Sequence, residues 1–123
     1  MTTPLVWKTC RMQAIYHRVS QSSLRYMRYL QARIPSGKDY RPVRNALERA
    51  VDALTALDTM AERPEGGDYR DCFYLVETAL VRLLTTNLFK ADHPTIRLAL
   101  LEMDKVIGVW SYDIELPVCD KAQ

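Results

Sequence analysis

An arginine and a histidine near the amino terminus are the first residues whose types and spacing could do chemistry. Arg11 and His17 are separated by five residues. A histidine can move protons and an arginine can stabilise charge on a phosphate. Neither histidine gives a catalytic case here, because His17 lies beside basic residues on a predicted helix and His93 precedes Pro94 in a predicted loop. A ribonuclease that uses Arg11 and His17 is our third hypothesis, behind two binding functions.

Other signatures of catalysis are missing from the sequence. There is no GxGxxG, GxxxxGK, GxSxG or HExxH motif. Cys10, Cys72 and Cys119 are odd in number and widely spaced, which argues against both a disulfide framework and a structural zinc site. The inward Glu-x-x-His pairs of a di-iron bundle are also absent, since no histidine follows Glu77 at position 80. We expect a protein that is not an enzyme and that holds no cofactor and no metal.

The net charge of +2 conceals a strong asymmetry between the two halves of the chain. Residues 1–49 contain ten basic and two acidic side chains, whereas residues 50–123 contain seven basic and thirteen acidic ones. The two sums, +8 and −6, predict an electrostatically polarised surface. Such a surface concerns the choice of partners and not the fold.

Arginines form a row along the first predicted helix. Arg11, Arg18 and Arg25 are seven residues apart and so stay within about 40° of one another on a helix, and Arg28 extends the row. The row projects away from the apolar face. Phosphates or an acidic partner could bind it, and Tyr16, Tyr26 and Tyr29 lie nearby to stack on bases. The alternatives are a solvated face, or ion pairs across the bundle with Asp52, Asp58 or Glu62.

Apolar residues recur at intervals of three, four and seven positions, which predicts four amphipathic helices. We expect them over residues 4–34, 41–63, 68–89 and 95–112, followed by a loose tail over 115–123. Pro35 and the segment Arg63-Pro64-Glu65-Gly66-Gly67 mark two of the breaks. The expected inward residues are Met12, Ile15, Val19, Tyr26, Leu30, Ile34; Val43, Leu47, Ala50, Leu54, Leu57, Ala61; Phe73, Val76, Leu80, Leu83, Leu84; and Ile96, Ala99, Leu100, Met103, Ile107, Trp110.

The fold expected from these helices is all-α. Strand alternation and hairpin dipeptides are absent, and short loops between four helices predict one antiparallel up-down four-helix bundle over residues 1–123. The 48% hydrophobic and 26% charged content fits a soluble folded domain. No apolar run approaches the roughly 20 residues of a membrane span, and no secretory signal pattern is visible. We expect a cytoplasmic protein that does not engage a membrane.

Gly108 stands out because a glycine inside an amphipathic helix costs about 1 kcal/mol relative to alanine. Two interpretations fit the sequence. The helix could fray before the tail, or it could pack closely on a neighbouring helix or subunit, with Trp110 beside the contact.

Three segments carry a resemblance to a known family. Ile34-Pro35 precedes a basic loop, Ala79-Leu80-Val81-Arg82-Leu83-Leu84 is a leucine- and arginine-rich stretch, and Lys105-Val106-Ile107-Gly108-Val109-Trp110 has a Gly-x-Trp ending. From Ile34 to Trp110 the chain resembles the accessory variability determinant (Avd) proteins of diversity-generating retroelements, and the related four-helix bundles encoded by 23S rRNA intervening sequences. An Ala-Asn-Ile-Ala-Glu-Gly type segment, typical of the second group, is replaced by Ser36-Gly37-Lys38-Asp39, which favours the Avd group.

The resemblance implies a cyclic homo-oligomer, commonly a pentamer, that binds a reverse transcriptase and its template RNA and supports mutagenic cDNA synthesis. Our leading hypothesis is such a non-catalytic accessory subunit, with RNA, and possibly DNA, as its nucleic acid. The residues expected to bind nucleic acid or partner are Arg11, Arg18, Arg25, Arg28, Arg33, Lys38, Arg41 and Arg44, and those expected in packing or assembly are Gly108 and Trp110.

Two rival hypotheses remain. The chain could be a protein-only interaction or regulatory bundle, phage- or plasmid-borne, whose basic first helix meets an acidic protein. It could also be the ribonuclease described above, since the Arg11/His17 spacing is similar to the nuclease motif of HEPN-type ribonucleases. In that family, however, the motif lies late in the helical domain and not in the first helix.

Overall fold

The protein is all-helical over residues 4–113, which a computed structural model describes, with side chains described over residues 13–108. These residues form four α-helices and two short 3₁₀ helices and contain no β-strand, so the all-α expectation is confirmed. In chain order the elements are α1 (Pro4–Arg33), η1 (Lys38–Tyr40), α2 (Arg41–Asp58), α3 (Gly66–Leu84), η2 (Lys90–Asp92) and α4 (His93–Asp113).

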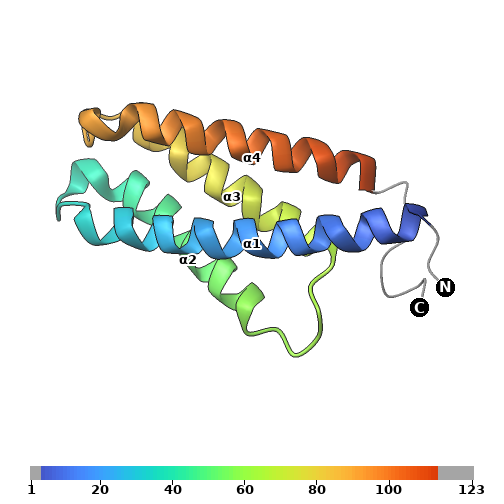
Figure 1. The fold of residues 1–123 in the computed structure, drawn as a ribbon. Coiled ribbons are helices and arrows are strands. Elements are labelled where there is room, and N and C mark those ends of the chain that lie inside the picture. Colours follow the sequence, from blue (N-terminus) through green and yellow to red (C-terminus); the bar gives the residue numbers. More distant parts are fainter. Residues whose placement is uncertain (1–3, 114–123) are drawn as a thin grey trace.

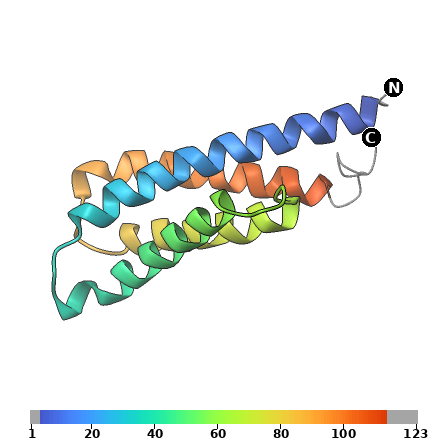
Figure 2. The same cartoon turned by 90° about the horizontal axis from the view of Figure 1, so that it is seen from below.

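The four helices pack unequally. Helix α3 contacts α1, α2 and α4, whereas α1 packs on α2 and α3 and stands further from α4. The connections over 34–40 and 85–92 lie together at one end of the bundle, and the 59–65 loop hangs below the middle of it (Figure 1). In Figure 2, α1 and α4 project to one side of the molecule, with α2 and α3 on the other. Helix α3 is therefore the central element, and the edge between α1 and α4 is the most open.

A single apolar core joins all four helices. Its largest fully buried side chains include Met27 and Leu30 from α1, Leu47 from α2, Leu80 from α3 and Ile96 from α4. Three aromatic rings pack at one end of this core, where Tyr16 lies 5.7 Å from Tyr69 and 6.3 Å from Phe73 between ring centroids. Burial of these side chains is the main stabilising contribution, at roughly 1.5–3 kcal/mol for each large one.

The stripe predicted on α1 differs from the observed one at its ends. Tyr16 is buried, whereas the predicted core residue Ile15 is 37% exposed and Tyr26 is half-buried. Ile15 turns toward the open edge beside α4, where it lines a cavity with Val106. The predicted inward residues Met12 and Trp110 lie outside the described side chains.

Helix α2 ends at Asp58 and not at the predicted residue 63. The Thr59 amide donates to the carbonyl oxygens of Thr55 and Ala56, and its hydroxyl does the same. Leu57 is the last buried residue of the stripe, and Ala61 is exposed. A further turn would bury no apolar surface, so packing does not extend the helix.

The remaining helix boundaries also differ from the predicted ones. Helix α3 begins at Gly66, two residues before the predicted start, because Asp68 accepts a 2.8 Å hydrogen bond from the Glu65 amide. It ends at Leu84 and not near Phe89, since the hydroxyls of Thr85 and Thr86 donate to carbonyl oxygens of the last turn. Helix α4 begins at His93, directly after η2, and not at residue 95.

Candidate nucleic-acid interface

The outward face of α1 carries the exposed part of the predicted arginine row. Arg18, Arg25 and Tyr29 are spaced by seven and four residues, which puts them on one side of the helix, and all three are exposed. No hydrogen bond or ion pair joins Arg18 or Arg25 to another residue of the described part of the chain. Their guanidinium groups are therefore available to an outside anion.

The alternative in which this row pairs with acids across the bundle is not what the described residues show. Asp58 accepts a short hydrogen bond from the Gln21 side chain. Arg28 donates to the Thr55 hydroxyl at 3.4 Å. The ion pairs Arg33–Asp92 at 3.4 Å and Arg70–Asp71 at 3.1 Å do not involve Arg18, Arg25 or Arg28.

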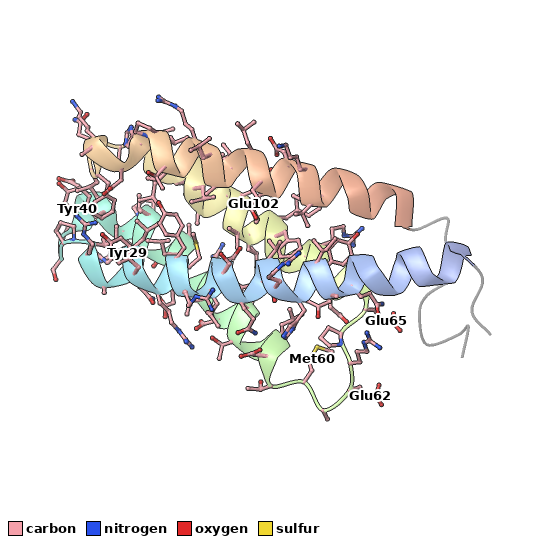
Figure 3. The ribbon with its side chains drawn as sticks, viewed as in Figure 1. Tyr29, Tyr40, Met60, Glu62, Glu65 and Glu102 are labelled. Atoms are coloured by element: carbon pink, nitrogen blue, oxygen red, sulfur yellow. The ribbon has the colours of Figure 1, made fainter. Side chains whose placement is uncertain are left out.

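An aromatic and arginine cluster closes the carboxyl-terminal end of α1. The Arg33 guanidinium lies 5.1 Å from the ring centroids of both Tyr29 and Phe89, and it pairs with Asp92. Tyr26 stacks on Tyr29 with an interplanar angle of 10° and ring centroids 6.3 Å apart. Tyr29 remains 52% exposed and is labelled at this end of the bundle in Figure 3. About half of the Tyr29 side chain is thus accessible to an outside ligand, although Tyr26 and Arg33 both lie against its ring.

Two members of the cluster were not identified by the sequence reasoning. Phe89 and Asp92 lie 56 and 59 residues after Arg33 in the sequence, and no local pattern links them to it. Phe89 has a φ of 54°, a left-handed conformation that a large side chain rarely adopts. Its carbonyl oxygen accepts a 2.8 Å hydrogen bond from the Asp92 amide.

The tyrosines differ in their fitness for stacking. Tyr16, predicted near the row, is 1% exposed and belongs to the core, so it cannot stack on a base. Burial is the main cause of the raised pKa of Tyr26, followed by the charge of Asp92, and this phenol stays neutral over the ordinary pH range. Tyr29 is the exposed aromatic of the set.

The basic residues after α1 fall into two groups. Lys38 and Arg41 are exposed at the junction between η1 and α2. Arg44 is half-buried and donates to the carbonyl oxygens of Pro35 and Gly37 at 3.1 and 2.7 Å. Arg44 therefore holds the 34–37 connection in place, while Lys38 and Arg41 extend the basic surface.

Of the two residues in the ribonuclease hypothesis, the structure describes the side chain of His17. His17 is exposed and lines a cavity of about 220 Å³ with Asp58, Glu62 and Arg63, beside the 59–65 loop. The Arg11 side chain itself lies outside the described residues.

The other chemical candidates are also structural. Burial raises the pKa of the Cys72 thiol to about 11, with smaller contributions from Asp71 and Asp68, so the nucleophilic thiolate is scarce at neutral pH. Among the described residues, no three side chains of His, Cys, Asp or Glu come together as a metal site requires. Over residues 4–113, no helix has both the length and the apolar content to cross a bilayer.

Gly108 has no packing partner within the described part of its own chain. A Cβ atom built at this glycine would meet no atom within 4 Å, and the residue is exposed. Close packing on the described residues of a neighbouring helix therefore does not explain it. The side chain of Trp110 lies outside the described residues.

Comparisons with known proteins add no family. No family model matches the chain, and neither the curated proteins nor the solved structures give a significant match.

Proposed function

We propose that this protein is a non-catalytic accessory subunit that binds RNA through the outer face of α1. The observation that carries the proposal is the exposed guanidinium group of Arg25, which has no hydrogen bond or ion pair with another described residue, one helical turn from the half-exposed ring of Tyr29 and beside the exposed Arg28. Arginines bind phosphates, and an exposed aromatic ring can stack on an unpaired base. Lys38 and Arg41 continue this basic surface toward α2.

The resemblance to the Avd proteins supports the finer parts of the proposal. By that resemblance, the protein partner is a reverse transcriptase, the RNA is its template in a diversity-generating retroelement, and the chain forms a cyclic homo-oligomer in the cytoplasm. The up-down antiparallel connectivity of the bundle is supported by the short connections and by the course of the ribbon in Figure 1. The second candidate is a bundle that binds an acidic protein with the same basic face.

The test is a fluorescence-anisotropy titration of a labelled structured RNA with unpaired loops. It is made at about 50 and about 200 mM salt, so that the dependence of the affinity on salt is measured. The variant R25E/R28E should weaken binding at the lower salt at least tenfold and should flatten the salt dependence, since two phosphate contacts contribute about 1.5 to the logarithmic slope. Tyr29→Ala should weaken binding of the same RNA about tenfold with an unchanged salt slope, because it removes stacking and not charge.

The matched control is R49E/R82E. Arg49 and Arg82 are exposed, line one cavity on the α2/α3 side and give the same change in net charge on a different face. Helical circular dichroism should be the same in all variants. If R49E/R82E weakens binding as much as R25E/R28E, the effect is one of net charge and the α1 interface is refuted. If the unaltered protein does not bind at the lower salt, the basic face serves a protein partner instead.

A further inference from the structure

The open edge between α1 and α4 forms an apolar groove. Two cavities of about 310 and 540 Å³ lie along it and share Val19 and Glu102 in their linings, so they are adjacent. Val76 and Leu80 of α3 contribute to the floor of the first cavity. At the rim, Leu98 is 67% exposed and Ile15 is 37% exposed. An apolar groove with exposed apolar walls is typical of a surface that another polypeptide covers.

Charges along this groove have a definite order. Arg18 of α1 and Lys105 of α4 line the larger cavity, toward the carboxyl-terminal half of α4. Glu102 lies between the two cavities, one helical turn closer to the start of α4, and Figure 3 shows it in the space between α4 and α1. In the direction of α4, the groove is thus negative at Glu102 and positive about one turn later, at Lys105.

A second unpartnered surface, which we call the ridge, lies on the outer face of α3 and α4. It consists of Tyr74, Glu77 and Val81 of α3 and Leu101 and Asp104 of α4. Tyr74, Val81 and Leu101 are 46%, 44% and 55% exposed, an unusual amount of apolar side chain for a solvent face. Glu77 of α3 and Asp104 of α4 lie close enough for Asp104 to raise the pKa of Glu77 to about 7.

The ridge carries charges in the opposite order to the groove. Glu77 and Asp104 make it negative toward the carboxyl-terminal half of α4, and Arg97 makes it positive two turns earlier. Along the axis of α4, Asp104 of the ridge and Lys105 of the groove differ in height by one residue, or about 1.5 Å. Arg97 of the ridge and Glu102 of the groove differ by five residues, or about 7.5 Å. A long arginine side chain spans the second difference. When two copies stand side by side at the same height, opposite charges therefore face each other.

We propose that the groove between α1 and α4 receives the ridge of a second copy of this chain. The apolar residues of the ridge cover the cavity floor, Glu77 and Asp104 face Arg18 and Lys105, and Arg97 faces Glu102. The contact joins two different faces and is heterologous. Both faces include α4, so they stand at an angle to each other, and repetition of the contact turns each successive copy, which gives a ring where the rotation closes.

Gly108 belongs to the same face as the ridge. It follows Leu101 by seven residues and Asp104 by four, and open space surrounds it within the described residues of its own chain. The absence of a side chain there lets the neighbouring copy approach the backbone of α4 closely.

This inference deepens the assembly part of the proposed function by naming the partner and the two faces, and it stands independently of RNA binding. Arg18 is assigned to the contact between copies, whereas Arg25, Arg28 and Tyr29 stay on the surface used for RNA. Failure of the RNA titration therefore leaves the assembly test intact, and failure of the assembly test leaves the titration intact.

The experiment measures molar mass by light scattering on the full chain at about 100 µM. The unaltered protein should elute as a multimer of several 14.2 kDa chains. The ridge variant Y74K/V81K and the groove variant R18E/K105E should each lower the mass to that of one chain. Met60→Lys is the matched control, because Met60 is an exposed apolar residue of the 59–65 loop outside both faces, and it should leave the mass unchanged.

Mixing the two variants gives the decisive result. The ridge variant keeps an intact groove and the groove variant keeps an intact ridge, so an equimolar mixture should form a complex of two chains and nothing larger. A mixture that stays at the mass of one chain overturns the proposal. It is also overturned if the unaltered protein is monomeric, which assigns the groove to another occupant, or if Met60→Lys dissociates the multimer as the other variants do. Leu98→Glu, at the groove rim, is a second groove variant should R18E/K105E lose its helical signal.

Discussion

Side chains of the same type have different roles here because their neighbours differ. Arg33 and Arg25 lie eight residues apart on one helix, yet Arg33 is held between two aromatic rings and a carboxylate, whereas Arg25 has no such neighbour among the described residues. Arg44 is different again, because two carbonyl oxygens of the 34–37 connection accept its hydrogen bonds. The chemistry available to an arginine is therefore set by what packs around it, and among these three Arg25 is the one free to bind a phosphate.

At the residue scale, the Glu77–Asp104 pair predicts a pH dependence of stability. A hydrogen bond with Asp104, burial, and repulsion by that carboxylate together raise the pKa of Glu77 to about 7 from a usual value of 4.5. The folded state therefore holds the Glu77 proton more tightly than the unfolded state does. The resulting stabilisation is full below pH 4.5 and is lost as the pH rises through 7. Because Glu77 is only partly buried, we expect a loss of about 1 kcal/mol between these limits.

Urea unfolding at a series of pH values checks this prediction. Glu77→Gln should show a smaller fall in the free energy of unfolding over the same pH range, because a neutral amide has no proton to lose. Glu48→Gln on the exposed face of α2 is the control and should follow the unaltered protein. Parallel pH profiles for the unaltered protein and Glu77→Gln would contradict the assignment.

At the scale of the elements, threonines and packing end the helices as much as proline and glycine do. Helix α2 stops where the apolar stripe stops, five residues before the predicted boundary, and Thr59 satisfies carbonyl oxygens of its last turn. Helix α3 stops at a pair of threonines whose hydroxyls bond to the preceding turn. Pro64 lies six residues after the end of α2, in the 59–65 loop, and Pro94 is the second residue of α4, so neither proline is the residue that ends α2 or α3.

Alanine substitutions at two glycines, Gly108 and Gly37, should have opposite effects on the stability of the fold. Gly108 lies in regular helix with open space around it, so Gly108→Ala should stabilise the isolated chain by about 0.5–1 kcal/mol. Gly37 has a φ of 152°, which other residues rarely adopt, so Gly37→Ala should destabilise it by about 1–3 kcal/mol. Urea unfolding at about 1 µM, where association is weak, measures both. Destabilisation by Gly108→Ala at that concentration would mean that α4 is not free there.

At the scale of the whole molecule, the helices are unequal partners. Helix α3 packs against all three others, while the α1–α4 edge is left open and charged residues of both signs line it. The basic residues of the first half of the sequence lie on α1 and the start of α2, so the uneven charge along the chain becomes an uneven charge between faces of the bundle. We propose RNA as the ligand of the basic face and another copy as the occupant of the open edge.

This inequality predicts an order of local stability. Native-state hydrogen exchange should be slowest in the core of α3, around residues 76–83, because opening α3 breaks contacts with every other helix. Amides of α4 around residues 95–103 should exchange at least tenfold faster, since among the described helices α4 packs closely only on α3. The measurement is made at about 1 µM in high salt, which screens the attraction between charged faces of two copies and leaves the open edge uncovered. Equal protection of α3 and α4 would contradict the open edge.

Much of the fold follows from the sequence alone. The all-α class and the number of helices follow from apolar periodicity, because an α-helix must bury one face and the intervals of three and four residues identify that face. Most of the inward residues of α2 and α3, such as Leu47, Leu54, Val76 and Leu80, are buried as predicted. The arginine row of α1 is also a property of spacing, and Arg18 and Arg25 are exposed as a row outside the apolar stripe should be.

The tertiary structure decided what lies opposite each face. Ile15 and Tyr16 are neighbours in sequence, and only the position of α4 relative to α1 determines that Tyr16 is buried and Ile15 lines a groove. The cluster of Arg33 with Phe89 and Asp92, and the pairing of Glu77 with Asp104, join residues that are far apart in the chain. Periodicity reports the direction in which a side chain points on its own helix. It carries no information about the distance to the next helix, and that distance created both the groove and the exposed ridge.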